Sequence, residues 1–330
     1  MKKLSICLIH HSNKKLLEEL ISSIEASNIN FSYEITILDN STKDDFIKTL
    51  QQKYKYIDII MSDKINGYAH NQNILLKKNI DKFNYHLVIN DDTFFIDKKS
   101  LQIMINFLDK RGDVIACSPQ ILNKDLTPQP VYGPIGSYVS HMIRMTNFSK
   151  IVNKRLINLL IKKNYLNFFP KIIKSYLSSH DLNKVNVRVD KISGCCMLIR
   201  NSGLHEIGLF DDINFDMYCD DTDWCLRANR LNKKLFKVSD ATIVHYGGMS
   251  NYPGMIIRKE TTIIKYLEKH YKKIIVNKIY LLLLIITSVI KAIFYLTLFM
   301  SSKNNIKLSK EYFKLSFITM SYFFFKINVK

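Results

Sequence analysis

The stretch that decides the fold is YHLVINDDTFF, residues 85–95. Its first half is a largely apolar run typical of a fully buried strand, and the run ends at Asn90, Asp91 and Asp92. In α/β sheets, ligands bind beyond the carboxyl ends of the strands. Carboxylates there can hold a hard divalent cation, although Asn and Asp are also ordinary turn residues. The stretch therefore predicts either a ligand site or a polar turn at the end of a strand.

Strand and helix patterns alternate on both sides of this stretch. The strand-like segments are LSICLI (4–9), YEITILDN (33–40), IDIIM (57–61) and DVIACSP (113–119). The helical segments are NKKLLEELISSIEAS (13–27), DDFIKTLQQKY (44–54), NILLKKNI (73–80) and KKSLQIMINFLDK (98–110). This alternation predicts an α/β fold with a Rossmann-like, mostly parallel central sheet and flanking helices.

The composition indicates a packed protein with an anionic partner. Of the 330 residues, 47% are hydrophobic, which is enough for a core and excludes global disorder. The 48 Lys and Arg residues outnumber the 29 Asp and Glu residues and give a net charge of +19. Such an excess favours nucleic acid, an acidic membrane surface or a phosphorylated ligand as partner, although a lysine-rich composition alone explains it equally well. The six cysteines have no regular spacing, which predicts free thiols in a reducing, cytoplasmic setting.

Two basic regions stand apart from the strand–helix alternation. The strand–helix alternation stops in residues 126–186, which we expect to form a basic helical insert. This insert would lie on the acceptor and membrane side of a domain that covers residues 1–254. Residues 255–330 predict amphipathic and hydrophobic helices, and 279–300 is long enough to cross a bilayer. Lys291 lies inside that segment at a cost of roughly 2.5–3.5 kcal/mol, and lysines crowd both of its flanks. We therefore expect these helices to lie in one leaflet rather than to form a single span.

A cluster of acids lies in NFDMYCDDTDWCLRANR, residues 214–230. A helix is predicted to begin near Asp221, and an acid at a helix N-terminus stabilises it by about 0.3–1 kcal/mol. One aspartate would need no further explanation, but Asp220, Asp221 and Asp223 together exceed what capping requires. A carboxylate at a helix N-terminus also stays ionised near neutral pH, as a general base must. Trp224 beside the acids suggests a ligand surface.

Three further polar groups follow predicted strands. Asp39 and Asn40 end one strand and suit either hydrogen bonds to a nucleotide or the capping of the next helix. The segment NGYAHNQN (66–73) contains Asn66, Gly67, Asn71 and Asn73 within eight residues. His245 ends the strand ATIVH and suits either a satisfied, partly buried histidine or a metal ligand. Neither a GxGxxG nor a GxxxxGK[ST] motif occurs, so dinucleotide and P-loop sites lose their main support.

Taken in order, these motifs resemble the family 2 glycosyltransferases of the GT-A fold. The motifs are LDNST, NGYAHNQN, INDD, SGCCMLIRNSGLHEIGLFDD, CDDTDWCLR and ATIVHYGG, within residues 3–250. The similarity is strongest to the rhamnosyltransferase-like branch that builds bacterial surface polysaccharides. It implies an inverting transferase that moves rhamnose or a hexose from a dTDP-, UDP- or GDP-linked sugar to a hydroxyl of a lipid-linked or oligosaccharide acceptor. It also implies O-antigen or capsule-type synthesis at the cytoplasmic face of the cell membrane.

On the donor side, the resemblance implies that Asp39 and Asn40 contact the nucleotide. The same role falls to the polar residues of the next motif, namely Asn66, Gly67, Asn71 and Asn73. Asp91 would lie beside the sugar or diphosphate. Asp92 and His245 would hold a divalent cation, Mg²⁺ or Mn²⁺.

On the acceptor side, the resemblance implies that Asp221 is the catalytic base and that Asp220 positions the acceptor or the base. Arg227 matches an arginine one helical turn beyond the acid pair, and the resemblance implies that it orients the pair and contacts the nucleotide-sugar donor. Trp224 would face the acceptor. Two residues depart from the family pattern, because Asp220 stands where Glu is usual and Asn90 occupies the first place of the DXD-type motif.

Functions from other classes remain as alternatives. A non-catalytic nucleotide-sugar-binding subunit of a polysaccharide-assembly complex would keep the fold without needing Asp221. A nucleic-acid-binding protein would use the positive charge, but acids at the strand ends would repel that ligand and no binding motif is present. A nucleotidyltransferase would carry a Gly-rich N-terminal loop, and IHHSNKK (9–15) has no glycine.

Overall fold

The computed structural model describes residues 3–12, 14–40, 45–129, 131–133, 135–136, 138–145, 186–247, 254–297 and 303–325. The chain divides into two compact units, one formed by residues 1–135 with 163–249 and the other by residues 136–162 with 250–330. Residues 136–145, which we assigned to an insert of the first domain, therefore group with the C-terminal helices. Residues 146–185, which make up most of the predicted basic helical insert, lie outside the described residues.

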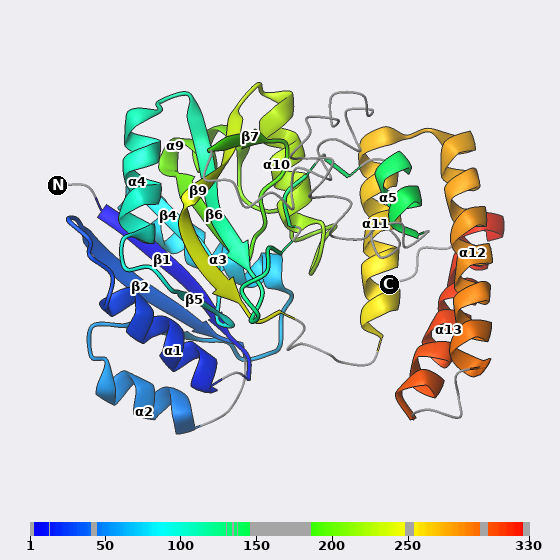
Figure 1. The fold of residues 1–330 in the computed structure, drawn as a ribbon, viewed down its shortest axis with the longest axis horizontal. Coiled ribbons are helices and arrows are strands. Elements are labelled where there is room, and N and C mark those ends of the chain that lie inside the picture. The colour runs from blue at the N-terminus through cyan, green and yellow to red at the C-terminus, as the bar shows by residue number, and fades with distance from the viewer. Residues whose placement is uncertain are drawn as a thin grey trace. The chain divides into compact units, whose positions relative to one another are not determined.

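The first unit is built on one mixed sheet (Figure 1). Its strands are β1 (Lys3–His10), β2 (Ser32–Asp39), β3 (Asp58–Met61), β4 (Tyr85–Asn90), β5 (Thr93–Phe95), β6 (Val114–Leu122), β7 (Val187–Val189), β8 (Cys196–Arg200) and β9 (Lys234–His245). They lie in the order β3-β2-β1-β4-β8-β6-β9-β5, and β7 pairs with β9.

Most of the strands run in one direction, as the sequence predicts. Strands β1 to β4 pair in parallel, and β6 pairs in parallel with β9. Strand β8 is antiparallel to both β4 and β6, and β5 and β7 are antiparallel to β9. Strand β5 reverses because the turn Asp91–Asp92 follows β4 directly, where the Thr93 hydroxyl donates to the Asn90 carbonyl at 2.7 Å.

Helices flank this sheet and bury one face each. They are α1 (Lys14–Glu25), α2 (Asp45–Lys53), α3 (Tyr68–Asn79), α4 (Ser100–Lys110), α9 (Asn201–Ile207) and α10 (Asp220–Arg230). In α1 the buried residues are Leu17, Leu20, Ile21 and Ile24, at the helical spacing read from the sequence. Helix α3 packs on β1 and β2, and α4 packs on β6 and β9. Strand β6 is buried along its whole length, so the core lies between sheet and helices.

The second unit is helical. It contains α5 (Tyr138–Met145), α11 (Met255–Tyr271), α12 (Ile274–Thr297) and α13 (Lys303–Phe325). Helix α12 packs against α13 and α5, and α11 packs against α13. Among the described residues, α12 is the one helix that is long and apolar enough to cross a membrane, judged by length and composition.

Candidate functional site

The polar strand ends that the sequence predicts meet at one edge of the sheet. In the parallel register, His10 pairs with Asp39 across β1 and β2, and Ile9 pairs with Asn90 across β1 and β4. The carboxyl ends of three strands are therefore level. The Nδ1 atom of His10 lies 3.6 Å from an Asp91 carboxylate oxygen, and the His10 imidazole is fully buried against the Phe46 ring.

Asp92 and His245 come together because β5 pairs with the end of β9. Thr93 lies opposite His245, and the Tyr246 N–H donates to the Asp92 carbonyl at 2.9 Å. This pairing brings His245 Nε2 to 3.2 Å from Asp92 Oδ1. His245 Nδ1 lies 2.8 Å from Gln129 Oε1, an amide oxygen that only accepts hydrogen bonds. Nδ1 is therefore the protonated nitrogen of the neutral ring, and the lone pair of Nε2 points toward Asp92.

These two side chains fit a divalent cation. Asp92 Oδ1 is buried and accepts no hydrogen bond from the described part of the chain, so a polar partner is missing there. A carboxylate together with an imidazole whose other nitrogen donates to a second group is a common arrangement of metal ligands. Within the described residues, no group of three or more His, Cys, Asp or Glu side chains is arranged so that it could hold a metal ion, so most ligands would have to come from a substrate and water.

The acid pair lies at the start of α10, where the backbone is strained. Tyr218 and Cys219 have positive φ angles of 66° and 60°, a conformation that non-glycine residues seldom adopt and that clusters at functional sites. The turn brings the carboxylate of Asp221 to Gly194, whose N–H donates to Asp221 Oδ2 at 3.2 Å. The Thr222 hydroxyl donates to Asp221 Oδ1 at 3.0 Å. Each oxygen of the Asp221 carboxylate therefore accepts one hydrogen bond, which fixes the orientation of the group.

Asp220 has a different environment. It is 5% exposed, and burial next to the charge of Asp221 raises the pKa of Asp220 to about 7. Burial and the charge of Asp220 also raise the pKa of Tyr68, so its hydroxyl stays protonated and donates to the Gly194 carbonyl at 2.9 Å. Two neighbouring carboxyls whose environments differ in this way are typical of acid–base sites.

Asp223 and Arg227, which follow the acid pair in α10, form an ion pair with each other. Asp223 is fully buried and accepts a hydrogen bond from Arg227 Nε at 2.8 Å. The Arg227 guanidinium also donates to the carbonyls of Ile207 and Leu209, which follow α9. This ion pair lies within α10, so Asp223 supports the helix. Arg227 uses three of its five N–H donors in these contacts, and its contact with a nucleotide sugar stays a prediction.

Trp224 is also a correction to the sequence-based prediction. Its indole has no exposed surface, and the ring N–H donates to the Gly208 carbonyl at 2.8 Å. The structure therefore does not place Trp224 toward an acceptor. The residue belongs to the buried stripe of α10 and holds the loop that follows α9.

The donor-side segment is held by paired amides. Asn40 donates to the Asn66 carbonyl at 3.1 Å, and the Asn66 N–H donates back to Asn40 Oδ1 at 2.9 Å. A Cβ on Gly67 would come within 2.5 Å of the Asp216 carbonyl, so this position requires glycine because the two chain segments approach closely.

Three of the predicted donor-side residues are fully or almost fully buried. Asn73 exchanges two hydrogen bonds with the backbone of Phe210, so it fixes a loop, and its contact with a nucleotide stays a prediction. Asn71 has no exposed surface, and its amide has no hydrogen-bond partner within the described residues. Asp39 is fully buried at the end of β2. Contact of Asn71 and Asp39 with a nucleotide stays a prediction.

Sequence reasoning missed four residues of this region. His10 contacts Asp91, Gln129 fixes His245, Gly194 contacts Asp221, and Lys191 lies near the acid pair. Burial lowers and the charge of Asp221 raises the pKa of Lys191, and the balance is a raised pKa. Of these, only His10 carries a local signal, because it ends a buried strand as Asp39 and Asn90 do. The other three come from segments far from their partners in sequence.

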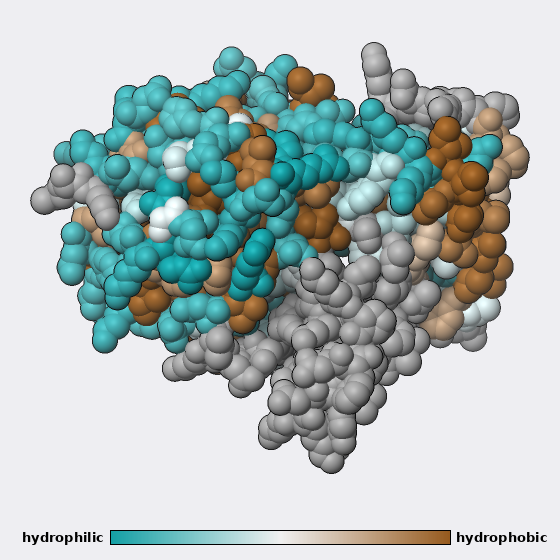
Figure 2. Space-filling view, turned by 90° about the horizontal axis from the view of Figure 1, so that it is seen from above, coloured by the Kyte–Doolittle hydropathy of each residue, from teal (hydrophilic) through white to brown (hydrophobic). Residues whose placement is uncertain are grey.

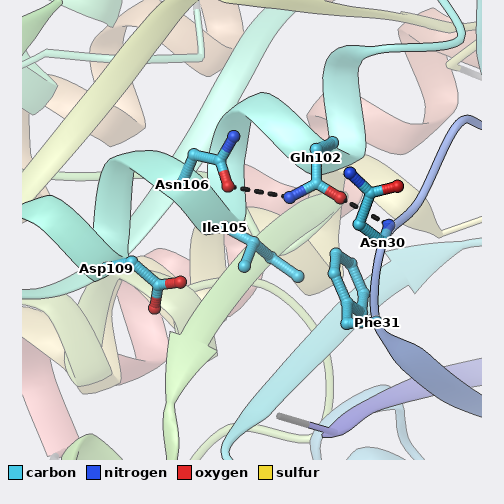
Figure 3. A pocket seen from close by; sticks show the side chains of 6 residues that line it. All are labelled: Asn30, Phe31, Gln102, Ile105, Asn106 and Asp109. Carbon is cyan, nitrogen blue, oxygen red and sulfur yellow. Dashed lines mark hydrogen bonds between the residues drawn. The ribbon is translucent and has the colours of Figure 1, made fainter. Parts of the chain in front are cut away.

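Of two pockets in the described part of the chain, one lies beside this site and the other lies away from it. One of about 320 Å³ is lined by Leu38, Ile60, Met61, Ser62, Asp63, Lys64, Asn66 and Ile74, next to the donor-side segment. The other, of about 350 Å³, lies between α4 and the start of β2, where the Gln102 amide bonds both Asn106 and the Asn30 backbone (Figure 3). It is at the amino end of β2 and contains none of the predicted site residues.

The family comparison identifies the fold and the class of enzyme. The model of the family described as "Glycosyl transferase family 2" matches residues 5–173, about half of the chain. The chain belongs to glycosyl transferase family 2. Among curated proteins, this family 2 chain is similar to rhamnosyltransferase WbbL of Escherichia coli (strain K12), at 25% identity over 252 residues, which cover 74% of the chain and 84% of WbbL. The predicted rhamnosyltransferase-like resemblance is confirmed.

Solved structures confirm the GT-A fold. GalNAc-T7 with UDP, GalNAc and Mn²⁺ superposes with a TM-score of 0.56 at 12% identity, over 80% of this chain and 48% of that one. Mannosyltransferase PcManGT from Pyrobaculum calidifontis, in complex with GDP-Man and Mn²⁺, gives 0.56 at 11% identity, over 98% and 87%. S. aureus TarS gives 0.50 at 14% identity, over 92% and 45%. The chain thus spans about half the length of GalNAc-T7 and TarS.

The Asp223–Arg227 ion pair predicts a large loss of stability in Arg227→Ala. Removing the guanidinium takes the ion-pair partner at 2.8 Å from a fully buried carboxylate, and breaking a buried ion pair costs roughly 3–5 kcal/mol. Urea denaturation followed by circular dichroism measures the effect. Arg188→Ala, at an exposed arginine of β7, should change stability by no more than about 0.5 kcal/mol. Equal stability of the two variants would contradict the structural role of Arg227.

The raised pKa of Asp220 predicts a pH-dependent stability. Because the pKa rises from 3.8 in the unfolded chain to about 7 in the folded one, the folded state holds its proton longer. The contribution of Asp220 to the free energy of unfolding is therefore fully present below pH 3.8, falls as the pH rises, and levels off above about pH 7. Asp220→Asn should weaken the decline of the melting temperature between pH 5 and pH 8. Asp240→Asn, at an exposed aspartate, should keep the wild-type decline, and an unchanged slope in Asp220→Asn would refute the assignment.

Proposed function

We propose that this protein transfers a sugar from a nucleoside-diphosphate sugar to an acceptor hydroxyl with inversion, with Asp221 as the general base. One observation carries the proposal. The Asn90 N–H donates to the Cys195 carbonyl at 3.0 Å, and the adjacent Gly194 N–H donates to Asp221. A single turn thus connects the end of β4, which carries Asp91 and Asp92, with the acid pair of α10.

Asp221 suits the base because its half-buried carboxylate is oriented by two hydrogen-bond donors. The acceptor oxygen attacks the anomeric carbon while its proton passes to Asp221. The bond from that carbon to the diphosphate oxygen breaks, and the electron pair leaves with the diphosphate. One displacement from the opposite face inverts the anomeric configuration. Asp220, whose pKa is raised, would position the acceptor or the base as a neutral partner.

Asp92 and His245 would hold the divalent cation, Mg²⁺ or Mn²⁺. When bound, such a cation neutralises the charge that develops on a departing diphosphate. Asp91 would lie beside the sugar or the diphosphate, and the buried His10 imidazole faces it. Two of the superposed structures contain Mn²⁺, which supports a cation of this kind.

The nucleotide would bind over Asp39, Asn40 and the Asn66–Asn73 segment. The buried Asn71 amide has unused hydrogen-bonding groups, and the 320 Å³ pocket beside Asn66 gives room for part of a ligand. WbbL is named a rhamnosyltransferase, and PcManGT was solved with GDP-Man, which supports rhamnose or a hexose as the donor sugar.

The acceptor would be a lipid-linked or oligosaccharide chain in O-antigen or capsule-type synthesis. The apolar α12 and the lysine-rich second unit support work at a membrane surface, and the free cysteines support its cytoplasmic face. The similarity to WbbL supports the same setting.

A donor panel tests the proposed reaction. Purified protein with Mn²⁺ or Mg²⁺ should release nucleoside diphosphate from one of the UDP-, GDP- or dTDP-sugars. Asp221→Asn should lower the rate by at least about 10²-fold, because general base catalysis contributes 10²–10⁴-fold, and should leave donor binding by calorimetry intact. Asp240→Asn is the matched control and should keep the wild-type rate. Donor binding without turnover in the wild type, with lipid acceptors supplied, would favour a non-catalytic binding subunit instead.

Gln129 offers a separate test of the cation site. Gln129→Met removes the acceptor of the His245 Nδ1–H, and loss of such a supporting hydrogen bond weakens metal binding by roughly 10–100-fold. Calorimetric titration of the variant with Mn²⁺ should show this weakening. Gln102→Met, at a glutamine of α4 remote from the site, should bind Mn²⁺ like the wild type. Unchanged affinity in Gln129→Met would exclude His245 as a ligand.

A further inference from the structure

The outer face of α12 is an uninterrupted apolar stripe. Its exposed side chains follow at intervals of three or four residues and are Ile275, Ile279, Leu282, Ile286, Ile290 and Ile293. We call this set the α12 stripe. The helix is about 36 Å long at 1.5 Å per residue, so the stripe is far longer than the scattered apolar residues of an ordinary soluble surface. Figure 2 shows hydrophobic side chains gathered over the C-terminal helices.

The opposite face of α12 is buried and packs against α13; it is mostly apolar and also carries Ser288 and Lys291. Ser288 is buried, and the Ser309 hydroxyl of α13 donates to the Ala292 carbonyl at 2.7 Å. The Lys291 ammonium lies 5.5 Å from the centre of the Tyr312 ring, and Tyr312 stacks on Tyr295. The single charge in the middle of α12 therefore points away from the stripe. A helix packed in this way presents hydrocarbon on one side only.

The register of α13 along α12 excludes a simple span. Residues 298–302 alone join the two helices, so they run antiparallel, and the Ser309–Ala292 bond fixes their levels. Lys310 and Lys314 follow Ser309 and are exposed. Lys314 lies five residues further along, about 7.5 Å, and so stands beside the middle of α12. If α12 crossed a bilayer, this exposed ammonium would lie deep in the hydrocarbon, where unpaired charges are strongly disfavoured.

We propose that α12 docks lengthwise on one leaflet of an anionic membrane, with the α12 stripe at the boundary between headgroups and acyl chains. This proposal deepens the membrane association within the proposed function and rests on it. An anionic membrane surface is the partner that complements the charge of this region, because α12 has no acidic residue and exposed lysines lie at its start and along α13. They are Lys272, Lys273, Lys278, Lys307, Lys310 and Lys314. Such lysines attract anionic headgroups while the apolar face enters the leaflet.

Vesicle flotation of the full chain tests the docking surface. The protein should float with vesicles of phosphatidylcholine and phosphatidylglycerol, and the bound fraction should fall when phosphatidylglycerol is left out. Ile286→Glu with Ile290→Glu should weaken the partition coefficient at least tenfold. Ile213→Glu, at a side chain of the first unit that is 93% exposed, is the control and should float like the wild type. Circular dichroism of all variants checks that they fold.

Labelling distinguishes lengthwise docking from a span. In a Cys219→Ser background, Lys272→Cys and Thr297→Cys place thiols at exposed positions at the two ends of α12, and Ile286→Cys places one at its middle. The protein is added outside preformed vesicles and treated with a membrane-impermeant maleimide. Lengthwise docking predicts full labelling at both ends and protection at the middle. Labelling of one end only after detergent would show a span and overturn the proposal.

Two other outcomes would also overturn it. Equal flotation of the double glutamate variant and the wild type would show that the α12 stripe does not contact lipid. Self-association that the double variant abolishes, without flotation of the wild type, would assign the stripe to a second copy of the chain. Both assays run without a sugar donor, so a protein that docks but turns over no donor would refute the proposed reaction and leave the docking intact.

Discussion

The turn at Gly194 and Cys195 is the constraint on which the site depends. Cys195 accepts a hydrogen bond from the end of β4, Gly194 donates to Asp221 at the start of α10, and the Gly194 carbonyl accepts from Tyr68 at the start of α3. Three elements that are distant in sequence are thereby held to one point. Because β8 leaves this turn antiparallel to β4, the sheet itself fixes the turn's position. The start of α10 and the end of β4 are both tied to this turn.

The sequence was sufficient for the parts of the site that lie at strand ends. A buried apolar run followed by a polar, ionisable residue is a local signal, and it placed Asp39, Asp92 and His245 at or just after the ends of strands, where the structure has them. The order of the motifs also identified the family. Local patterns predicted the helices of the second unit as well, because their apolar periodicity is strong.

The rest required contacts that no local pattern encodes. Gln129 supports His245 across 116 residues, and Gly194 meets Asp221 across 27. The packing of Trp224 and Arg227 was missed for a related reason. An aromatic and a cation beside an acid cluster resemble a ligand surface in sequence, but tertiary packing turned both toward the loop after α9. The grouping of α5 with the C-terminal helices likewise depends on packing between distant segments.

The two units divide the chemistry of the chain. The first holds the acid pair and the candidate cation ligands at the end of a rigid sheet, whereas the second combines an apolar stripe with exposed lysines. The net charge of +19, ambiguous as a composition, gains a physical meaning from this division, because the described helices of the second unit carry many lysines and few acids. A soluble donor and a membrane-borne acceptor would need such a division.

A single displacement assisted by Asp221 inverts the anomeric configuration, so the stereochemistry of the reaction is the decisive measurement. Proton NMR can follow the slow hydrolysis of whichever nucleoside-diphosphate sugar the protein turns over, before the free sugar mutarotates. The first anomer formed should have the configuration opposite to that of the donor. A first-formed anomer with the donor's configuration would require two displacements or a different mechanism, and would contradict the role assigned to Asp221.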